Sequence, residues 1–212
     1  MKRLTKLANK YKTDKGTTYE WSHGFTEFYE PYFAKYEHPV ILELGVERGS
    51  AEKMLNDFYD GDCTIYCVDM NDLSHLFTEY ENIKFFQCDL SKKEEIDQLM
   101  AKLWNVKFDI IIDDASHLWF DQFLALSMLN KLLKKDGIYV LEDLHTSFRT
   151  DIWGDNKEFT DSPLYFLNRM DTGEHTDLVL NIKDVIIYNH TNPCNTMVDP
   201  PRSITSIITF RD

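Results

Sequence analysis

Strand-like and helix-like segments alternate from about residue 39 to residue 143, and this alternation constrains the fold more than any other feature of the sequence. Short apolar runs typical of strands lie at Val40–Leu44, Thr64–Val68, Ile83–Phe86, Phe108–Ile112 and Ile138–Leu141. Between them, helical spacing of apolar residues marks Ala51–Tyr59, Lys92–Leu103 and Asp121–Leu133. Strands joined by helices in this way form right-handed βαβ units. The sequence therefore predicts an α/β fold with a Rossmann-like, doubly wound and mostly parallel sheet.

The flanking segments complete the prediction of a single domain, which a length of 212 residues suits. Residues 1–38 are rich in aromatic side chains and are expected to form a short N-terminal helical arm. Residues 39–144 would be the ligand-binding core, and residues 145–182 would form a lid over it. Within the lid, residues 145–175 are polar and aromatic with little periodicity. Within residues 183–212, Val185–Tyr188 and Ile204–Phe210 are expected to be closing strands that pair antiparallel at one edge of the sheet.

Two finer expectations concern helix ends. Ser91 is a plausible N-cap, with Glu94 three residues later as its capping-box partner. The helix that starts at Asp121 is expected to stop near Gly137.

Composition limits the environment and the partners. The chain has 36 acidic and 23 basic residues, a formal net charge of −13, which argues against broad nucleic-acid binding. No apolar run reaches the roughly 18 residues of a membrane span, and the basic N-terminus lacks the apolar stretch of a signal peptide. The cysteines, Cys63, Cys67, Cys88 and Cys194, form no CxxC pair and are expected to be free thiols. We expect a cytoplasmic protein; the aromatic arm could serve a homo-oligomer.

A glycine turn follows the first predicted strand. Gly45 and Gly49 let the backbone approach a ligand closely at the start of a helix. A dinucleotide fingerprint requires a further glycine where this chain has Glu47, whose charge opposes a pyrophosphate. S-adenosylmethionine has no phosphate, and Asp69 at the end of the next strand is placed to bind two ribose hydroxyls. The turn therefore favours S-adenosylmethionine over a dinucleotide.

Carboxylates gather at the ends of the fourth and fifth predicted strands. Asp113 and Asp114 follow one strand, and Glu142 and Asp143 follow the other. Neighbouring carboxylates repel, and Mg²⁺, Mn²⁺ or Ca²⁺ would relieve this because hard cations prefer oxygen ligands. Such a cation would lower the pKa of a substrate hydroxyl, and His117 lies where a neutral imidazole could take the proton. A role for His145 stays open.

At these residues the chain resembles the class I S-adenosylmethionine-dependent methyltransferases, and more narrowly the metal-dependent sugar O-methyltransferases of the macrolide-glycoside and capsular-sugar type. The resemblance is carried by Lys12–Gly16, His23–Tyr29, Ile41–Ser50, Ile110–His117 and Leu141–Phe148. The pairing of DDASH with EDLHTSF is its specific part, because the glycine turn alone fits many methyltransferases.

The resemblance implies roles for individual residues. Asp114, Glu142 and Asp143 match Mg²⁺ ligands, and His117 matches the general base. Positions that meet the cofactor are Glu43, Gly45, Asp69 and Asp89, with Asp89 towards the adenine. Gly49 completes the turn, and Asp113 is expected near the sulfonium methyl or behind the metal.

The implied activity is methylation of a sugar hydroxyl in a nucleotide sugar, a glycan precursor or a glycosylated metabolite. Residues 145–182 would then form the wall of the site for this small-molecule acceptor. Two alternatives stay open. One is a metal-dependent hydroxylase-type enzyme on the same fold, which would need a redox-active metal held by both His117 and His145. The other is a non-catalytic module that only binds the cofactor.

Overall fold

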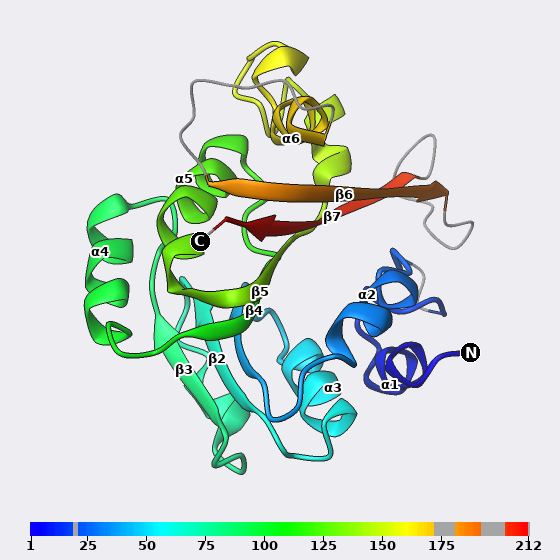
Figure 1. Cartoon of the computed structure of the whole chain (residues 1–212), viewed down its shortest axis with the longest axis vertical. Helices are drawn as coiled ribbons and strands as arrows, with labels where there is room; N and C mark the ends of the chain where they lie inside the picture. The colour runs from blue at the N-terminus through cyan, green and yellow to red at the C-terminus, as the bar shows by residue number, and fades with distance from the viewer. Residues whose placement is uncertain (19–20, 172–180, 192–201, 212) are drawn as a thin grey trace.

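The computed structural model describes residues 1–18, 21–171, 181–191 and 202–211, in which seven strands form a mixed sheet in the order β3-β2-β1-β4-β5-β7-β6 (Figure 1). The parallel strands are β1 (Val40–Leu44), β2 (Thr64–Asp69), β3 (Ile83–Gln87), β4 (Phe108–Asp113) and β5 (Leu133–Leu141). The strand order reverses between β1 and β4, which is where open α/β sheets bind their ligands. The predicted fold class is confirmed.

Helices cover both faces of the sheet. On one side lie α1 (Arg3–Tyr11), α2 (Thr26–Phe33) and α3 (Ser50–Phe58); on the other lie α4 (Lys93–Lys102), α5 (Trp119–Leu129) and α6 (Pro163–Asp171) (Figure 1). Short 3₁₀ turns are η1 (Ser74–Phe77), η2 (Asn130–Leu132), η3 (Leu144–Phe148) and η4 (Phe159–Asp161). The predicted helical arm is therefore present as α1 and α2.

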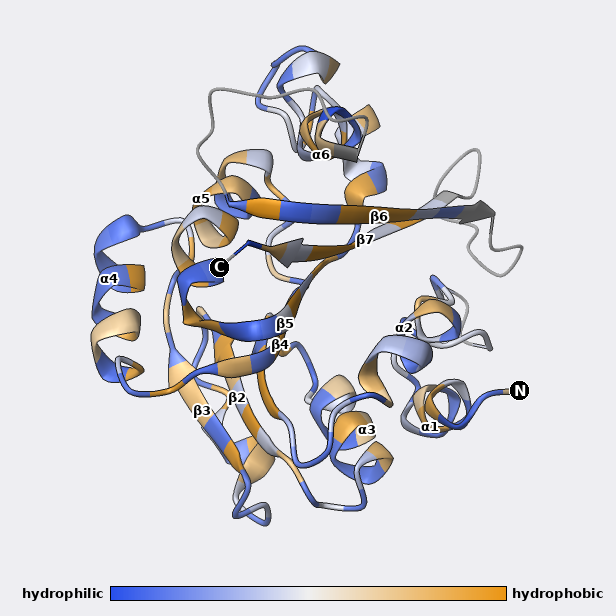
Figure 2. Cartoon of the chain, viewed as in Figure 1, coloured by the Kyte–Doolittle hydropathy of each residue, from blue (hydrophilic) through white to orange (hydrophobic). Residues whose placement is uncertain are grey.

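Two apolar cores result, because successive side chains of a strand point to opposite faces. In β1, Ile41 packs with α1, α2 and α3, whereas Leu42 and Leu44 pack with α4 and α5. Both faces of the central strands are therefore apolar, and hydrophobic residues run along them in Figure 2. Such strands are typical of a parallel sheet covered on both sides.

The expected helix ends differ from the structure at two places. Ser91 is not an N-cap: α4 starts at Lys93, and the Ser91 hydroxyl donates to the carboxylate of Asp89 at 2.7 Å. Glu95, rather than Glu94, reaches back to accept from the Asp89 N–H at 2.8 Å. At the second place, Gly137 lies inside β5, because α5 already ends at Leu129 and a 3₁₀ turn leads directly into the strand.

The closing strands pair as expected but are longer than the sequence suggested. β6 (Ile182–Thr191) and β7 (Arg202–Phe210) are antiparallel, and β7 adds antiparallel to β5. Within the segment expected to be an irregular lid, α6 packs its Leu167 into the core of the α4–α5 face. Helix α6 was not predicted, because its apolar residues Leu164–Leu167 are consecutive and do not show helical spacing.

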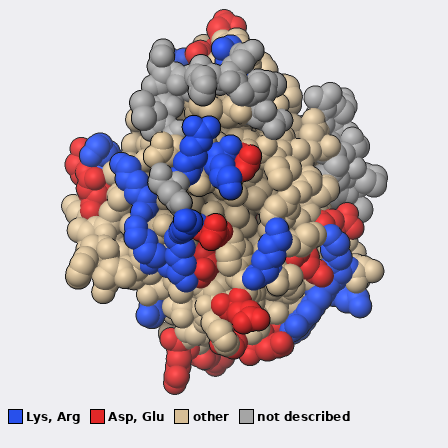
Figure 3. Space-filling view, in the orientation of Figure 1, with Lys and Arg blue, Asp and Glu red and all other residues tan. Residues whose placement is uncertain are grey.

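The described surface carries its charges unevenly. On the face seen in Figure 3, Lys and Arg side chains gather in groups beside acidic ones, although the chain has a net charge of −13. No helix in the described parts of the chain combines the length and the apolar character of a membrane span. Cys63, Cys67 and Cys88 are buried free thiols, as expected, whereas Cys194 and the aromatic Tyr19 lie outside the described residues.

Candidate active site

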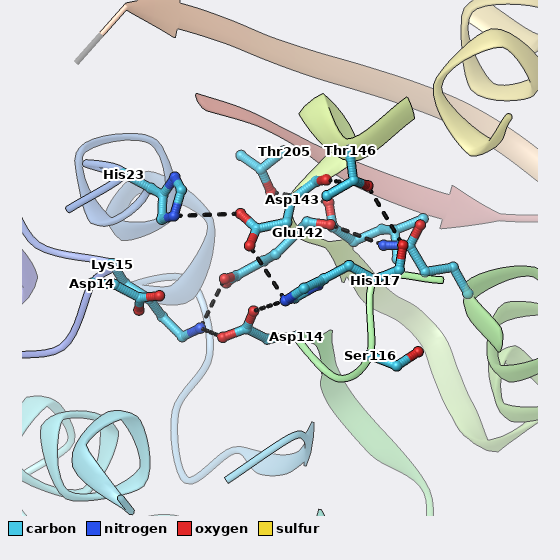
Figure 4. A network of polar contacts seen from close by, with 12 residues as sticks. Asp14, Lys15, His23, Asp114, Ser116, His117, Glu142, Asp143, Thr146 and Thr205 are labelled. Carbon is cyan, nitrogen blue, oxygen red and sulfur yellow. Dashed lines mark hydrogen bonds and ion pairs between the residues drawn. The ribbon is translucent and has the colours of Figure 1, made fainter. Parts of the chain in front are cut away.

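A cavity of about 520 Å³ opens at the carboxyl ends of β1, β2, β3 and β4. A volume in this range suits a nucleoside cofactor or a drug-sized ligand. Residues predicted to bind ligands that line it are Glu43, Gly45, Asp69, Asp89, Asp114 and His117. The lining does not include Gly49, Asp113, Glu142 and Asp143, of which the last two lie near Asp114 (Figure 4).

The glycine turn brings the loops after β1 and β4 into contact. Gly45 has φ 91°, and a Cβ added there would lie 2.1 Å from the carbonyl oxygen of Asp114. Only glycine permits both this backbone conformation and this close approach. Gly49 has φ 71° and precedes α3, with the ring of Phe77 at 3.0 Å from such a Cβ. The turn thus fixes one wall of the cavity.

Three acidic side chains line the cavity in the part that follows β1, β2 and β3. Asp69 accepts from the N–H of Val46 at 3.1 Å, which ties the end of β2 to the glycine turn. Asp89 is held by Ser91 beside β3. Glu43 is fully buried, and its two carboxylate oxygens have no hydrogen-bond partner among the described residues. A buried carboxylate at a cavity wall is suited to a cationic group of a ligand.

Lys15 is a site residue to which the sequence prediction gave no role. Its side chain is fully buried, and its ammonium pairs with Asp114, with Glu142 at 2.7 Å and with Glu43 at 3.9 Å (Figure 4). Burial alone would lower the pKa of Lys15, but Asp114 and Glu142 more than offset this and hold it well above its ordinary value. Glu142 also accepts from the hydroxyl of Tyr29 at 2.9 Å. The N-terminal arm thus supplies a permanent positive charge to the strand ends.

His117 lies between two carboxylates. Its Nε2 is 3.4 Å from Oδ2 of Asp143 and 4.0 Å from Oδ1 of Asp114 (Figure 4). It has φ 58°, and about a quarter of its side chain (24%) is exposed. The ring therefore lines the cavity and also lies close to the two acids.

Asp143 has histidines on more than one side. Its Oδ1 is 3.7 Å from Nε2 of His23 and 3.7 Å from Nδ1 of His145. Burial alone would raise the pKa of Asp143, but His23, His117 and His145 together lower it below its ordinary value. Burial lowers the pKa of His145 below its ordinary value. His23 belongs to one of the segments that carry the resemblance. Its contact with Asp143 was not predicted, because the two residues are far apart in the sequence and meet only through tertiary packing.

Asp113 faces the interior rather than the cavity. Its carboxylate accepts from the Tyr139 hydroxyl at 2.8 Å, and burial raises its pKa to about 7. Its predicted place near a cofactor methyl group remains a prediction.

Comparison with known proteins supports the resemblance, although no family model matches the chain. It is 28% identical over 187 residues to mycinamicin VI 2''-O-methyltransferase of Micromonospora griseorubida, covering 82% of this chain and 45% of that protein. It is 29% identical over 163 residues to demethylmacrocin O-methyltransferase of Streptomyces fradiae, covering 72% of this chain and 39% of that protein. The chain thus spans less than half the length of these curated relatives.

Solved structures give the same answer for the fold. The MycE methyltransferase of the mycinamycin pathway, in complex with Mg, SAH and mycinamycin VI, superposes with a TM-score of 0.77 at 24% identity. That alignment covers 99% of this chain and 55% of MycE. This chain has the class I methyltransferase fold. A putative O-methyltransferase from Klebsiella pneumoniae also aligns, with a TM-score of 0.64 at 8% identity over 100% of this chain and 91% of its own. The resemblance to sugar O-methyltransferases is confirmed.

The donor set of this methyltransferase fold fits a divalent cation. Ligand atoms of Asp114, His117 and Asp143 lie within 4.8 Å of one another, so the two carboxylates could share a cation beside the imidazole. Both oxygens of Glu142 already accept hydrogen bonds, from Lys15 and Tyr29. That Glu142 is a third ligand of the cation therefore stays a prediction from the sequence.

Glu52 of α3 is a second buried acid that the sequence did not single out. It is fully buried, its carboxylate has no hydrogen-bond partner in the described structure, and burial raises its pKa to about 8. Glu52 also contributes to raising the pKa of Glu43 well above its ordinary value, after the larger effect of burial.

Replacing Lys15 tests the ion-pair network. We expect Lys15→Met to lower the free energy of unfolding by about 3–5 kcal/mol, because it leaves buried carboxylates without their cation. Denaturant unfolding measures this loss. Lys93→Met, which removes an exposed ion pair with Asp97 on α4, is the control and should leave stability unchanged. Equal stability of both variants would show that Lys15 does not stabilise the cluster.

Replacing Glu52 tests its raised pKa. A carboxyl whose folded-state pKa is raised stabilises the fold below its unfolded pKa, and this stability is lost as pH rises through the folded pKa, here about 8. We therefore expect Glu52→Gln to match the wild type near pH 5 and to be more stable near pH 9 by roughly 1–4 kcal/mol. Thermal or denaturant unfolding at the two pH values measures this. The exposed Glu94→Gln is the control, and a difference independent of pH would contradict the account.

Proposed function

We propose that this chain is an S-adenosylmethionine-dependent and divalent-metal-dependent O-methyltransferase that acts on a sugar hydroxyl. The observation that carries the proposal is His117, held beside Asp114 and Asp143 at the wall of the cavity. An imidazole between two carboxylates is suited to accept a proton, because they stabilise the imidazolium that forms.

The donor would occupy the part of the cavity lined by the glycine turn. Asp69 ends β2 and would bind the ribose hydroxyls, and Asp89 follows β3 and would lie towards the adenine. Glu43 would face the ammonium group of the aminoacyl tail. Gly45 lets the loop after β4 approach the turn closely, which brings Asp114 to the same cavity as Asp69 and Asp89. The absence of a third glycine at Glu47 disfavours a pyrophosphate in the same place.

Different residues would bind the metal and accept the proton. Asp114 and Asp143 would hold the divalent cation, and His117 would take the proton of the acceptor hydroxyl on Nε2. When bound, the cofactor supplies the methyl group and Mg²⁺ supplies Lewis acidity that lowers the pKa of the hydroxyl. Much of the rate would come from holding donor and acceptor in line.

The acceptor is proposed to be a small molecule that contains a sugar. The relatives named above include enzymes for mycinamicin VI and demethylmacrocin, and MycE was solved with mycinamycin VI. As to organisation, we propose one methyltransferase domain, with an arm at residues 1–38, a cofactor-binding core at 39–144, an acceptor-facing segment at 145–182 and closing strands at 183–212. A cytoplasmic location and the absence of nucleic-acid partners belong to the same proposal.

Replacing His117 tests the assignment of the base. We expect His117→Ala to lower kcat by roughly 10²–10⁴-fold, because general-base catalysis typically contributes this much. Binding of S-adenosylhomocysteine should persist, since the cofactor residues are untouched; calorimetry measures binding, and a methylation assay over a panel of glycosylated acceptors with and without chelator measures activity.

His75→Ala in η1 is the matched control and should keep full activity, because this histidine does not line the cavity. Near-normal turnover of His117→Ala would refute the base assignment. Failure of the wild type to bind S-adenosylhomocysteine would refute the whole proposal.

A further inference from the structure

Asp143 presents its two carboxylate oxygens to different partners. Oδ2 faces His117 at 3.4 Å, on the side of Asp114 and the cavity. Oδ1 faces Nε2 of His23 and Nδ1 of His145, each at 3.7 Å. His23 comes from the loop before α2, whereas His145 comes from η3 after β5 (Figure 4 shows His23 reaching Asp143). Two imidazoles from distant parts of the chain thus converge on one oxygen atom.

Two of the atoms that meet here are buried side-chain atoms of Asp143 and His145. Oδ1 of Asp143 and Nδ1 of His145 have no hydrogen-bond partner among the described residues. Asp143 is 8% exposed, and the His145 side chain is 10% exposed. A separation of 3.7 Å is too long for a direct hydrogen bond. It is close to the spacing of about 3.4 Å between two ligands bound to one tetrahedral metal at 2.0–2.1 Å.

The rings are fixed in this orientation by their neighbours. Nδ1 of His23 lies 3.1 Å from the hydroxyl of Ser203 on β7, which leaves Nε2 directed at Asp143. The His23 ring stacks on Phe25 at 5.0 Å and on His145 at 5.4 Å. A hydrogen bond from the second ring nitrogen is the usual support of a metal-binding histidine.

We propose that His23, Asp143 and His145 form a second metal site, which takes a divalent transition metal such as Zn²⁺ or Co²⁺. The ligand atoms of these residues lie within 4.8 Å of one another. Two imidazoles and one carboxylate select borderline metals over Mg²⁺, which prefers oxygen ligands. The carboxylate of Asp143 would bridge this site and the cavity side, with one oxygen for each.

Such a metal would connect the N-terminal arm to the end of β5. His23 precedes α2, and His145 and Asp143 follow β5, so the ion would fix the arm against the loop that carries Asp143. It would thereby hold Oδ2 of Asp143 in its position beside His117. The site depends on no bound cofactor, so its test is separate from that of the proposed function.

Cobalt titration tests the site directly. The full chain, freed of any histidine tag and stripped with chelator, is titrated with Co²⁺ in the presence of millimolar Mg²⁺, and the visible d–d absorbance is recorded. We expect a nitrogen-ligated Co²⁺ band that Mg²⁺ does not remove and Zn²⁺ does. His23→Gln and His145→Gln should each weaken binding by about 10-fold or more, whereas His75→Gln should match the wild type.

Two results would overturn the proposal. One is a wild-type protein that gives no such band, a result that does not depend on the folding of any variant. The other is a band lost in His117→Gln but retained in His145→Gln, which would place the cobalt in the group of Asp114, His117 and Asp143 instead. Circular dichroism of each variant establishes that a loss of the band is not a loss of fold.

Discussion

The ion pairs of the buried Lys15 ammonium are the interaction on which the carboxyl ends of the parallel strands depend. Parallel strands bring their carboxyl ends together, and here those ends carry Glu43, Asp114 and Glu142 within reach of one Nζ atom. Burying carboxylates without a cation costs several kcal/mol for each charge. Lys15 offsets this cost for the inner acids, and it makes the N-terminal arm a part of the site rather than a mere cover.

The charge of Asp143 is balanced mainly by histidines rather than by Lys15. Asp143 is surrounded by His23, His117 and His145 instead. Asp114 stands between the two groups, since it pairs with Lys15 and approaches His117. The carboxyl ends of the strands therefore carry two groups of acids. The inner group surrounds the permanently charged Lys15, and the outer group, around Asp143, can have its charge balanced by protons on the histidines or by metal ions. Proton transfer is therefore expected in the outer group, where His117 lies beside Asp143.

Much of the fold could be predicted from local signals. The apolar runs at β1 and β4 predicted buried strands, and the structure has them. The glycines after β1 predicted a close approach to a ligand, whereas the close approach that the structure shows at Gly45 is to the backbone of Asp114. Helix ends were less predictable, because Ser91 bonds to Asp89 instead of capping α4. Lys15 and Glu52 could not be placed, since a Lys or Glu is normally exposed and only tertiary packing buries these two.

The most direct test of the account is a crystal structure of the full chain with S-adenosylhomocysteine and Mn²⁺, recorded with anomalous scattering. The account predicts cofactor density along Gly45, Asp69 and Asp89, and an anomalous peak between Asp114 and Asp143 beside His117. A cavity that stays empty at saturating cofactor, or a manganese peak away from Asp114, would contradict it.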